Sequence, residues 1–487
     1  MPRLIPRPMP RATAGLNGPS VAALAAVLML SACKTFSPDG GMGPVAALAS
    51  QELNKDVVAL RSDEDTAAAR AAVERLLRRP LTADTAVQIA LFNNRGLQAA
   101  YNALGIAEAS MIEASLPPNP AFSVERLSSS VEIEIERRIV ANILALATLP
   151  ARANIAADRF RQAQLRAAEE TLRVAAETRR AYYRAVAGRE LAGFLTQAQS
   201  AAEAATQLAR RLGESGAINK LDQAREQVFY ADITVQLASA RQRAASDRER
   251  LVRALGLWGN DLDFKLPNAL PALPRPWNLP FIEVEAIRRR ADLQVARIEL
   301  DALAKSFGLT QATRFINLLE VAGIGKKVRE RETGETARSR GFELEFQIPI
   351  FDFGEVRVRQ AEQTYMQAVN RLAEKAVNVR SEARDAYRAY RSTYDIAMHY
   401  RREVLPLRKI ISDETLLRYN AMQIDVFALL AEVRQRIVAT TTAIEAQRDF
   451  WLAATDLRVA VAGGGGGASA GEGSRPMVSA DTGAAGH

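Results

Sequence analysis

The chain has few of the residues that carry chemistry. It contains one cysteine and two histidines among 487 residues. A single cysteine excludes an intramolecular disulfide, and neither His399 nor His487 has a cysteine or carboxylate cluster at metal-ligand spacing, so we predict no metal site. No set of nucleophile and base can be assembled around His399. A phosphate-binding glycine loop follows a strand, and the glycines at 463–467 do not. We therefore expect no enzyme and no bound cofactor.

The chain also lacks a long apolar run. A short apolar run, residues 21–30, follows Arg3, Arg7 and Arg11. This run is too short to span a bilayer as a permanent helix, so we predict a cleaved signal over residues 1–32. Its removal lowers the formal charge from +8 to +5. Because the remaining cations lie beside acids along helices, we expect no nucleic-acid partner. Any membrane insertion must then be of the β type.

The end of this signal, Leu30-Ser31-Ala32-Cys33, resembles a bacterial lipobox. The resemblance implies that Cys33 is the first mature residue and carries a covalent lipid. Lys34 stands where an aspartate usually retains lipoproteins at the inner membrane, so the outer membrane is implied. The alternative is an ordinary secretory signal with a chance cysteine.

Two long stretches have almost no proline. Residues 151–266 contain no proline, and residues 355–462 contain no glycine and only Pro406. Such composition favours helix. We predict two long helical hairpins, 151–256 and 355–462, that turn at 213–216 and 419–424, with Pro406 kinking its helix or marking a join.

Each returning helix carries an apolar seam at steps of three and four residues, the spacing typical of a coiled coil. The seam residues are Leu221, Ala224, Val228, Ala231, Val235 and Ala238 in the first hairpin, and Val426, Leu430, Val433, Ile437, Thr440 and Ile444 in the second.

Two short segments alternate between apolar and acidic residues, as a strand with one greasy and one charged face does. We predict that the apolar set faces lipid and the acidic set faces a water-filled lumen, where rings of carboxylates favour cations. A soluble sheet with one solvated face shows the same alternation. The lipid-facing set is Val131, Ile133, Ile135, Phe342, Leu344, Phe346 and Ile348, and the lumen-facing set is Glu132, Glu134, Glu136, Glu343 and Glu345.

The strand-plus-hairpin unit therefore occurs twice. We predict a mainly α protein with a small β part, in which a proline-rich linker separates the copies and a Gly/Ala/Ser tail is disordered. The expected parts are a leader 33–80, a first repeat 81–256 with a β hairpin 119–137, a linker 257–280, a second repeat 281–462 with a β pair 315–350 around a polar loop 329–340, and the tail 463–487.

Three segments resemble the TolC-like family of outer-membrane efflux proteins. Leu116-Pro117-Pro118-Asn119-Pro120 is similar to that family's helix-to-strand turn, and the segment 348–354 (IPIFDFG) to its strand-to-helix turn. Residues 419–424 (YNAMQI) with 427–430 (FALL) are similar to its second hairpin tip. Phe351 and Phe353 are either interfacial aromatics or core residues at this turn.

The resemblance implies a homotrimer with a twelve-stranded barrel in the outer membrane and a helical tube in the periplasm. It implies a passive exit duct for an inner-membrane transporter, RND-type by preference, joined through a periplasmic adaptor. The adaptor would contact the hairpin tips, namely Leu212, Gly213, Ser215, Gly216, Tyr419, Asn420, Ala421 and Met422. Asn420 is the tip residue expected to adopt a left-handed conformation.

A gate is implied just past the second tip. The family often places a leucine and an aspartate four residues apart there, and this chain has Phe427 and Ala431, followed by Glu432. Phe427 is therefore expected to close the tube by bulk and dewetting in place of an acidic ring. Two rival functions are a periplasmic adaptor lipoprotein, which would show one hairpin within a β-rich sandwich, and a non-porous coiled-coil lipoprotein.

Overall fold

The computed structural model describes residues 35–316 and 318–464. These residues are mainly helical with one four-stranded sheet, which confirms the predicted fold class. They divide into two compact units. The sheet unit contains Glu108–Ala157 and Thr313–Gly354, and the helical unit contains the chain before, between and after those segments from Asp39 onward. Within the described residues, no helix combines the length and apolarity needed to cross a bilayer.

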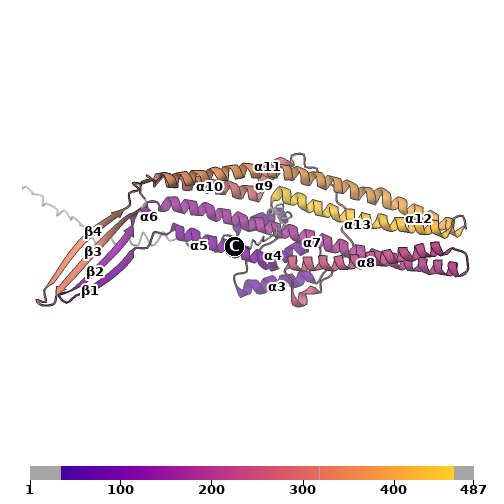
Figure 1. The fold of residues 1–487 in the computed structure, drawn as a ribbon, viewed down its shortest axis with the longest axis horizontal. Helices are drawn as coiled ribbons and strands as arrows, with labels where there is room; N and C mark the ends of the chain where they lie inside the picture. The colour runs from indigo at the N-terminus through magenta and orange to yellow at the C-terminus, as the bar shows by residue number, and fades with distance from the viewer. Residues whose placement is uncertain (1–34, 317, 465–487) are drawn as a thin grey trace, which may run out of the picture. The chain divides into compact units, whose positions relative to one another are not determined.

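The sheet is antiparallel throughout, and its order β1-β2-β3-β4 follows the chain (Figure 1). The β1–β2 hairpin is followed by the short helix α6 (Ile143–Ala147). The strands are β1 (Ala121–Ser128), β2 (Glu132–Asn142), β3 (Leu319–Glu330) and β4 (Thr336–Phe346).

The strand boundaries differ from the predicted ones. β2 runs on to Asn142, past residue 137, and β3 and β4 occupy much of the predicted polar loop 329–340, so that only five residues join them. Pairing between neighbouring strands supplies the hydrogen bonds of these charged stretches. A run of exposed arginines therefore looks like a loop in sequence and folds as a strand.

The helical unit repeats one arrangement. In the first copy, α4 (Ala83–Asn93) packs on α8, and the hydroxyl of Tyr182 on α7 donates to the carbonyl of Leu81 at 3.0 Å. Thr82 caps α4 through a reciprocal pair of bonds with Thr85. The helices of this copy are α4, α5 (Arg95–Ser115), α7 (Leu149–Glu214) and α8 (Lys220–Leu255), preceded by α2 (Gly43–Leu53) and α3 (Asp63–Leu77).

In the second copy, α9 lies against α11 and α13, and α10 runs beside α11 (Figure 1). Ile282, Tyr390 and Phe450 form its core. Between the copies, residues 256–281 are irregular apart from the turn η1 (Gly259–Leu262). The helices are α9 (Ile282–Arg289), α10 (Ala291–Ala312), α11 (Glu355–His399), the π-helical turn η2 (Tyr400–Val404), α12 (Leu405–Asn420) and α13 (Val426–Ala462).

The expected interruption at Pro406 takes the form of η2, which ends two residues before it at Val404. Proline has no N–H, so one carbonyl of the preceding turn lacks its usual donor. The wider π turn rearranges the hydrogen bonds there, and the chain continues as a helix. The two copies join through aromatic contacts, because the rings of Tyr183 and Trp451 stack with centroids 5.0 Å apart.

One predicted seam is correct and one is wrong. In α13, Val426, Leu430, Ile437 and Ile444 are buried. In α8, all six predicted seam residues are exposed, and burial falls instead on a neighbouring stripe that includes Ile233 and Leu237. Both stripes have coiled-coil spacing, so periodicity alone could not decide which one the partner helix covers.

Candidate transport surface: the sheet faces and the hairpin tips

The register of the sheet separates its charges by sign. Residues paired across antiparallel strands share a face, and residues alternate between faces along each strand. Applied to the four strands, this rule places every strand carboxylate on one face, which we call the acidic face. Its carboxylates are Glu125, Glu132, Glu134, Glu136, Glu320, Glu330, Glu343 and Glu345.

The five glutamates predicted to face a lumen are thus on one face. Glu125, Glu320 and Glu330 join them and were missed, because their strands show no alternation strong enough to reveal a face. The acidic face also carries apolar side chains, including Leu127 and Val328, which pair with Glu134 on either side. It is therefore less uniformly acidic than the sequence suggests.

Two cations partly neutralise the acidic face. Arg138 Nη2 contacts Glu343 at 2.8 Å, and Lys326 Nζ donates to Glu134. Both pairs bridge strands and are half-exposed, so each contributes modestly to stability. Six carboxylates of the acidic face have no ion pair among the described residues, which leaves the face strongly negative.

The opposite face is apolar toward the Leu319–Phe346 end of the sheet. Phe342 is 84% exposed, and Ile139, Phe122 and Leu344 are also exposed in the single chain. Exposed aromatic and aliphatic side chains in contiguous rows indicate a surface that something covers. Val131 and Ile348, also predicted to face lipid, lie outside the strands: Val131 precedes β2, and Ile348 lies beyond the end of β4.

After β4, the chain enters α11 through a tight turn. Gly354 has φ +73°, and a Cβ there would lie 2.2 Å from the carbonyl oxygen of Arg314, so this position requires glycine. Arg314 Nε donates to the carbonyl of Phe353 at 3.0 Å. Phe351 is 97% exposed and Phe353 is also exposed, which contradicts core packing for these two rings within one chain.

The two hairpin tips have the same hydrogen bonds at an offset of 206 residues. In the first tip the N–H of Ala217 donates to Leu212 at 2.8 Å, and in the second the N–H of Gln423 donates to Arg418 at 2.9 Å. The helices that follow are capped by Asn219 and Asp425, again 206 apart. The predicted tip residues therefore lie in two equivalent turns.

The left-handed position of the second tip is Met422, not Asn420. Met422 has φ +58°, matching Gly216 with φ +76° in the first tip, whereas Asn420 is the last residue of α12. The position of the left-handed residue is set by the helix-ending hydrogen bonds, which override the intrinsic preference of asparagine. Met422 is 93% exposed, so no packing compensates for its conformation.

The predicted gate residues differ in their surroundings. Phe427 is half-buried against the cluster of Ala205, Val426 and Leu430, Ala431 is exposed, and Glu432 is buried. Arg408 Nη1 donates to Glu432 at 3.1 Å. Glu432 would have to leave this partner to form a charged ring.

A second buried ion pair near the tips was not predicted. Glu226 on α8 is 2% exposed and accepts from Arg434 Nη2 on α13. The pair joins the two hairpins of the chain. Nothing in the local sequence marks it, because Glu226 and Arg434 lie 208 residues apart.

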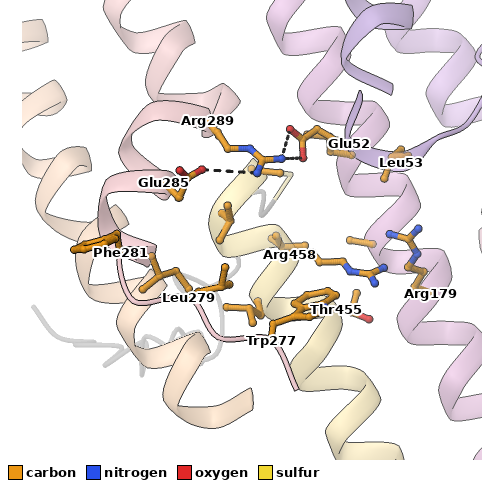
Figure 2. Close-up of a pocket in the computed structure, with 18 of the residues that line it drawn as sticks. Glu52, Leu53, Arg179, Trp277, Leu279, Phe281, Glu285, Arg289, Thr455 and Arg458 are labelled. Atoms are coloured by element: carbon orange, nitrogen blue, oxygen red, sulfur yellow. Dashed lines mark hydrogen bonds and ion pairs between the residues drawn. The ribbon is translucent and has the colours of Figure 1, made fainter. Parts of the chain in front are cut away.

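The helical unit contains a cavity of about 490 Å³ (Figure 2). Arg289 closes one side by donating to both oxygens of Glu52 at 2.7 Å, and Arg458 extends toward Arg179 over the ring of Trp277. Thr455 carries the only hydroxyl in the lining and donates it to the carbonyl of Trp451. The lining therefore has no activated nucleophile, and we assign the cavity no chemistry.

Among the described residues, no three His, Cys, Asp or Glu side chains are grouped as metal ligands. Cys33, the predicted lipid attachment site, and most of the predicted tail lie outside the described residues.

Comparison with known proteins gives a consistent picture. Residues 284–410 match the sequence model of a family described as outer membrane efflux protein. The chain is 24% identical over 295 residues to the cobalt-zinc-cadmium resistance protein CzcC of Cupriavidus metallidurans, an alignment that covers 56% of this chain and 64% of that relative. The match thus spans a little under two thirds of the relative's length.

Solved structures share the fold. The Campylobacter jejuni CmeC outer membrane channel superposes with a TM-score of 0.67 at 15% identity, covering 79% of this chain and 86% of the channel. The open state of the Neisseria gonorrhoeae MtrE outer membrane channel gives 0.64 at 16% identity, covering 80% and 89%. At these identities the likeness concerns the fold alone.

Proposed function

We propose that this chain is an outer membrane efflux protein and forms the outer-membrane exit duct of a tripartite efflux system. It would conduct substrates passively from an inner-membrane transporter to the outside. The observation that carries the proposal is the sheet: carboxylates occupy one face, and an exposed apolar band occupies the other. A wall between water and lipid needs this division.

The sheet also supports assembly from several chains. β1 and β4 are its edges, and each leaves backbone donors and acceptors unpaired in one chain. Open edges do not occur in lipid, because unsatisfied backbone groups there cost several kcal/mol each. Three copies would close twelve strands into a barrel, so we propose a homotrimer in the outer membrane of a Gram-negative bacterium.

The resemblance to efflux proteins also implies two partners. The equivalent tips at 212–217 and 418–423 are the proposed contacts of a periplasmic adaptor, and the transporter beyond it would be of the RND type. The rival adaptor function fits poorly, because the described strands form one sheet and the helices form two hairpins.

The negative charge of the acidic face favours cationic substrates. The excess of carboxylates over cations on the acidic face would enrich the lumen in cations, and the CzcC relative is named for resistance to cobalt, zinc and cadmium. We therefore propose divalent metal cations among the substrates, without a binding site of their own.

The direct test is conductance of the purified protein in planar bilayers. We expect cation-selective channels, higher basal conductance in Phe427→Ala, and weaker cation selectivity in Glu345→Lys but not in the control Glu64→Lys on α3. Protein that never conducts, even with Phe427 removed, would support a structural lipoprotein instead.

We also propose that a lipid on Cys33 anchors the mature chain. Cys33→Ala should abolish labelling by radioactive palmitate and leave the precursor with its signal attached. Labelling that persists in the variant would rule out this attachment site.

A further inference from the structure

The apolar face of the sheet carries a set of cations that transport does not use. Of the eight Lys and Arg residues in the four strands, two lie on the acidic face and six on the apolar face. We call these six the basic belt, and all of them are exposed. The basic belt consists of Arg126, Arg137, Lys327, Arg329, Arg338 and Arg340.

The basic belt lies beyond the apolar rows, toward the hairpin turns. The last apolar row aligns Phe122, Ile139 and Phe342, and the next row toward the turns contains Arg137 and Arg340. Lys327 and Arg338 occupy the row after that, paired directly with each other. The three cationic rows extend about 14 Å along the strands at 3.4 Å per residue.

In the described part of the chain, no carboxylate neutralises the basic belt. All strand carboxylates are on the other face, and none of the six belt residues has an ion pair among the described residues. Lys327 and Arg338 are like charges directly opposite each other on neighbouring strands, an arrangement that destabilises a sheet in the absence of an anion.

The backbone leaves room for that anion. Gly325 stands between Arg137 and Arg340 in their row, and a Cβ added to it would meet nothing within 4 Å. Gly323 leaves the adjoining position of the last apolar row equally open. The result is an open notch on the lipid side, with arginines on both sides of Gly325 and Lys327 next to it in the chain.

We propose that the basic belt binds the phosphate groups of a phosphorylated glycolipid in the outer leaflet, with the notch at Gly325 as its centre. Arginine forks match phosphate oxygens in pairs, and acyl chains of the same lipid would cover the apolar rows beside the belt. Beside the headgroups a barrel tolerates such charges, whereas at the bilayer midplane each costs about 2–4 kcal/mol. The inference rests on the proposed function, which puts this face in lipid.

The test uses the full-length protein in detergent, with diphosphoryl lipid A, dephosphorylated lipid A and inorganic pyrophosphate as separate probes. Native mass spectrometry should detect tight binding of diphosphoryl lipid A only, since the phosphate-free lipid lacks the charge and pyrophosphate lacks the acyl chains. Equal binding of both lipids would overturn the proposal, and equal binding of pyrophosphate would reassign the belt to free anions.

Two variants locate the site. Arg137→Gln with Arg338→Gln and Arg340→Gln should weaken lipid binding at least tenfold, whereas the charge-matched control Arg243→Gln with Arg253→Gln and Arg388→Gln on α8 and α11 should not. Gly325→Val fills the notch without changing charge and favours the strand, so it should also weaken binding. Lipid binding unchanged in both belt variants would overturn the proposal.

Channel recordings on the same variants separate this inference from the proposed function. Belt variants should conduct as the parent does, because the acidic face is intact. A parent protein that forms no channel would contradict the proposed function, whereas a conducting parent without phosphate-dependent lipid binding would contradict only the basic belt.

Discussion

Single residues hold the two hairpins of the chain together near their tips. Glu226 is almost fully buried and its main partner is Arg434, whose guanidinium also lies 4.7 Å from the centroid of the Phe229 ring. One oxygen of Glu226 has no hydrogen-bond partner among the described residues. A buried charge with one partner depends strongly on that partner.

We therefore expect Glu226→Gln to destabilise the protein by about 2 kcal/mol, because Arg434 loses its counter-charge in a largely buried place. The measurement is the midpoint of thermal unfolding followed by circular dichroism. Glu214→Gln is the matched control, since its pair with Arg210 is exposed on both sides and should contribute little. Equal midpoints for the two variants would contradict this assignment.

Glu190 should make stability depend on pH. Burial raises the pKa of the Glu190 carboxyl above its usual value, and the N–H of Leu270, which donates to it at 2.8 Å, offsets only part of that shift. A carboxyl with a raised pKa binds its proton more tightly when folded, so its contribution is complete below the unfolded pKa and is lost as pH rises through the folded pKa.

Glu190→Gln should remove this loss of stability at higher pH, because glutamine does not ionise. The melting temperature of the variant relative to the parent should rise between pH 4 and pH 7, measured in one buffer series at constant ionic strength. The exposed Glu203→Gln is the control. A difference that stays constant with pH would show that Glu190 ionises equally well in both states.

Among the structural elements, the hairpin tips show how strictly the chain is duplicated. Two turns of different sequence make the same hydrogen bonds 206 residues apart, yet one uses Gly216 and the other Met422 at the left-handed position. An L-residue with a side chain pays about 1–2 kcal/mol for that conformation.

Met422→Gly should consequently stabilise the second tip by about 1 kcal/mol. Slower amide hydrogen exchange at residues 422 and 423 would report it. Ala421→Gly is the control, because Ala421 has φ −80° and gains nothing from glycine. Faster exchange in the Met422→Gly variant would contradict this prediction. It would indicate that the methionine side chain stabilises the tip through a contact with another molecule.

The exposed seam of α8 bears on how whole chains assemble. Leu221, Val228 and Val235 recur every seven residues and are all exposed in one chain. A heptad stripe without a partner in its own chain fits a neighbouring helix of another chain, which agrees with the open edges of the sheet.

Val228→Asp with Val235→Asp should therefore leave the chain folded but reduce the assembly to monomers. Light scattering in detergent gives the mass, and circular dichroism gives the helix content. The control, Gln227→Asp with Gln236→Asp, adds the same charge on exposed positions outside the seam. Trimers that persist in the seam variant would show that α8 is not an interface.

Much of the fold and part of the candidate site follow from local pattern. The missing prolines and glycines predicted the long helices, and the alternation in β2 and β4 predicted which side chains share a face. The family match over residues 284–410 includes one of the three resembling segments, 348–354, whereas 116–120 and 419–430 lie outside it.

The sequence by itself determined the strand faces and the hairpin tips, because each depends on residues a few positions apart, and it determined the duplication because these local patterns occur twice. Only the tertiary structure decided which seam of α8 is covered, which residue turns the second tip, and that eight carboxylates and six cations gather on opposite faces of one sheet. Those outcomes depend on strand register and helix packing between segments up to about two hundred residues apart, and such pairings leave no periodic trace in the chain.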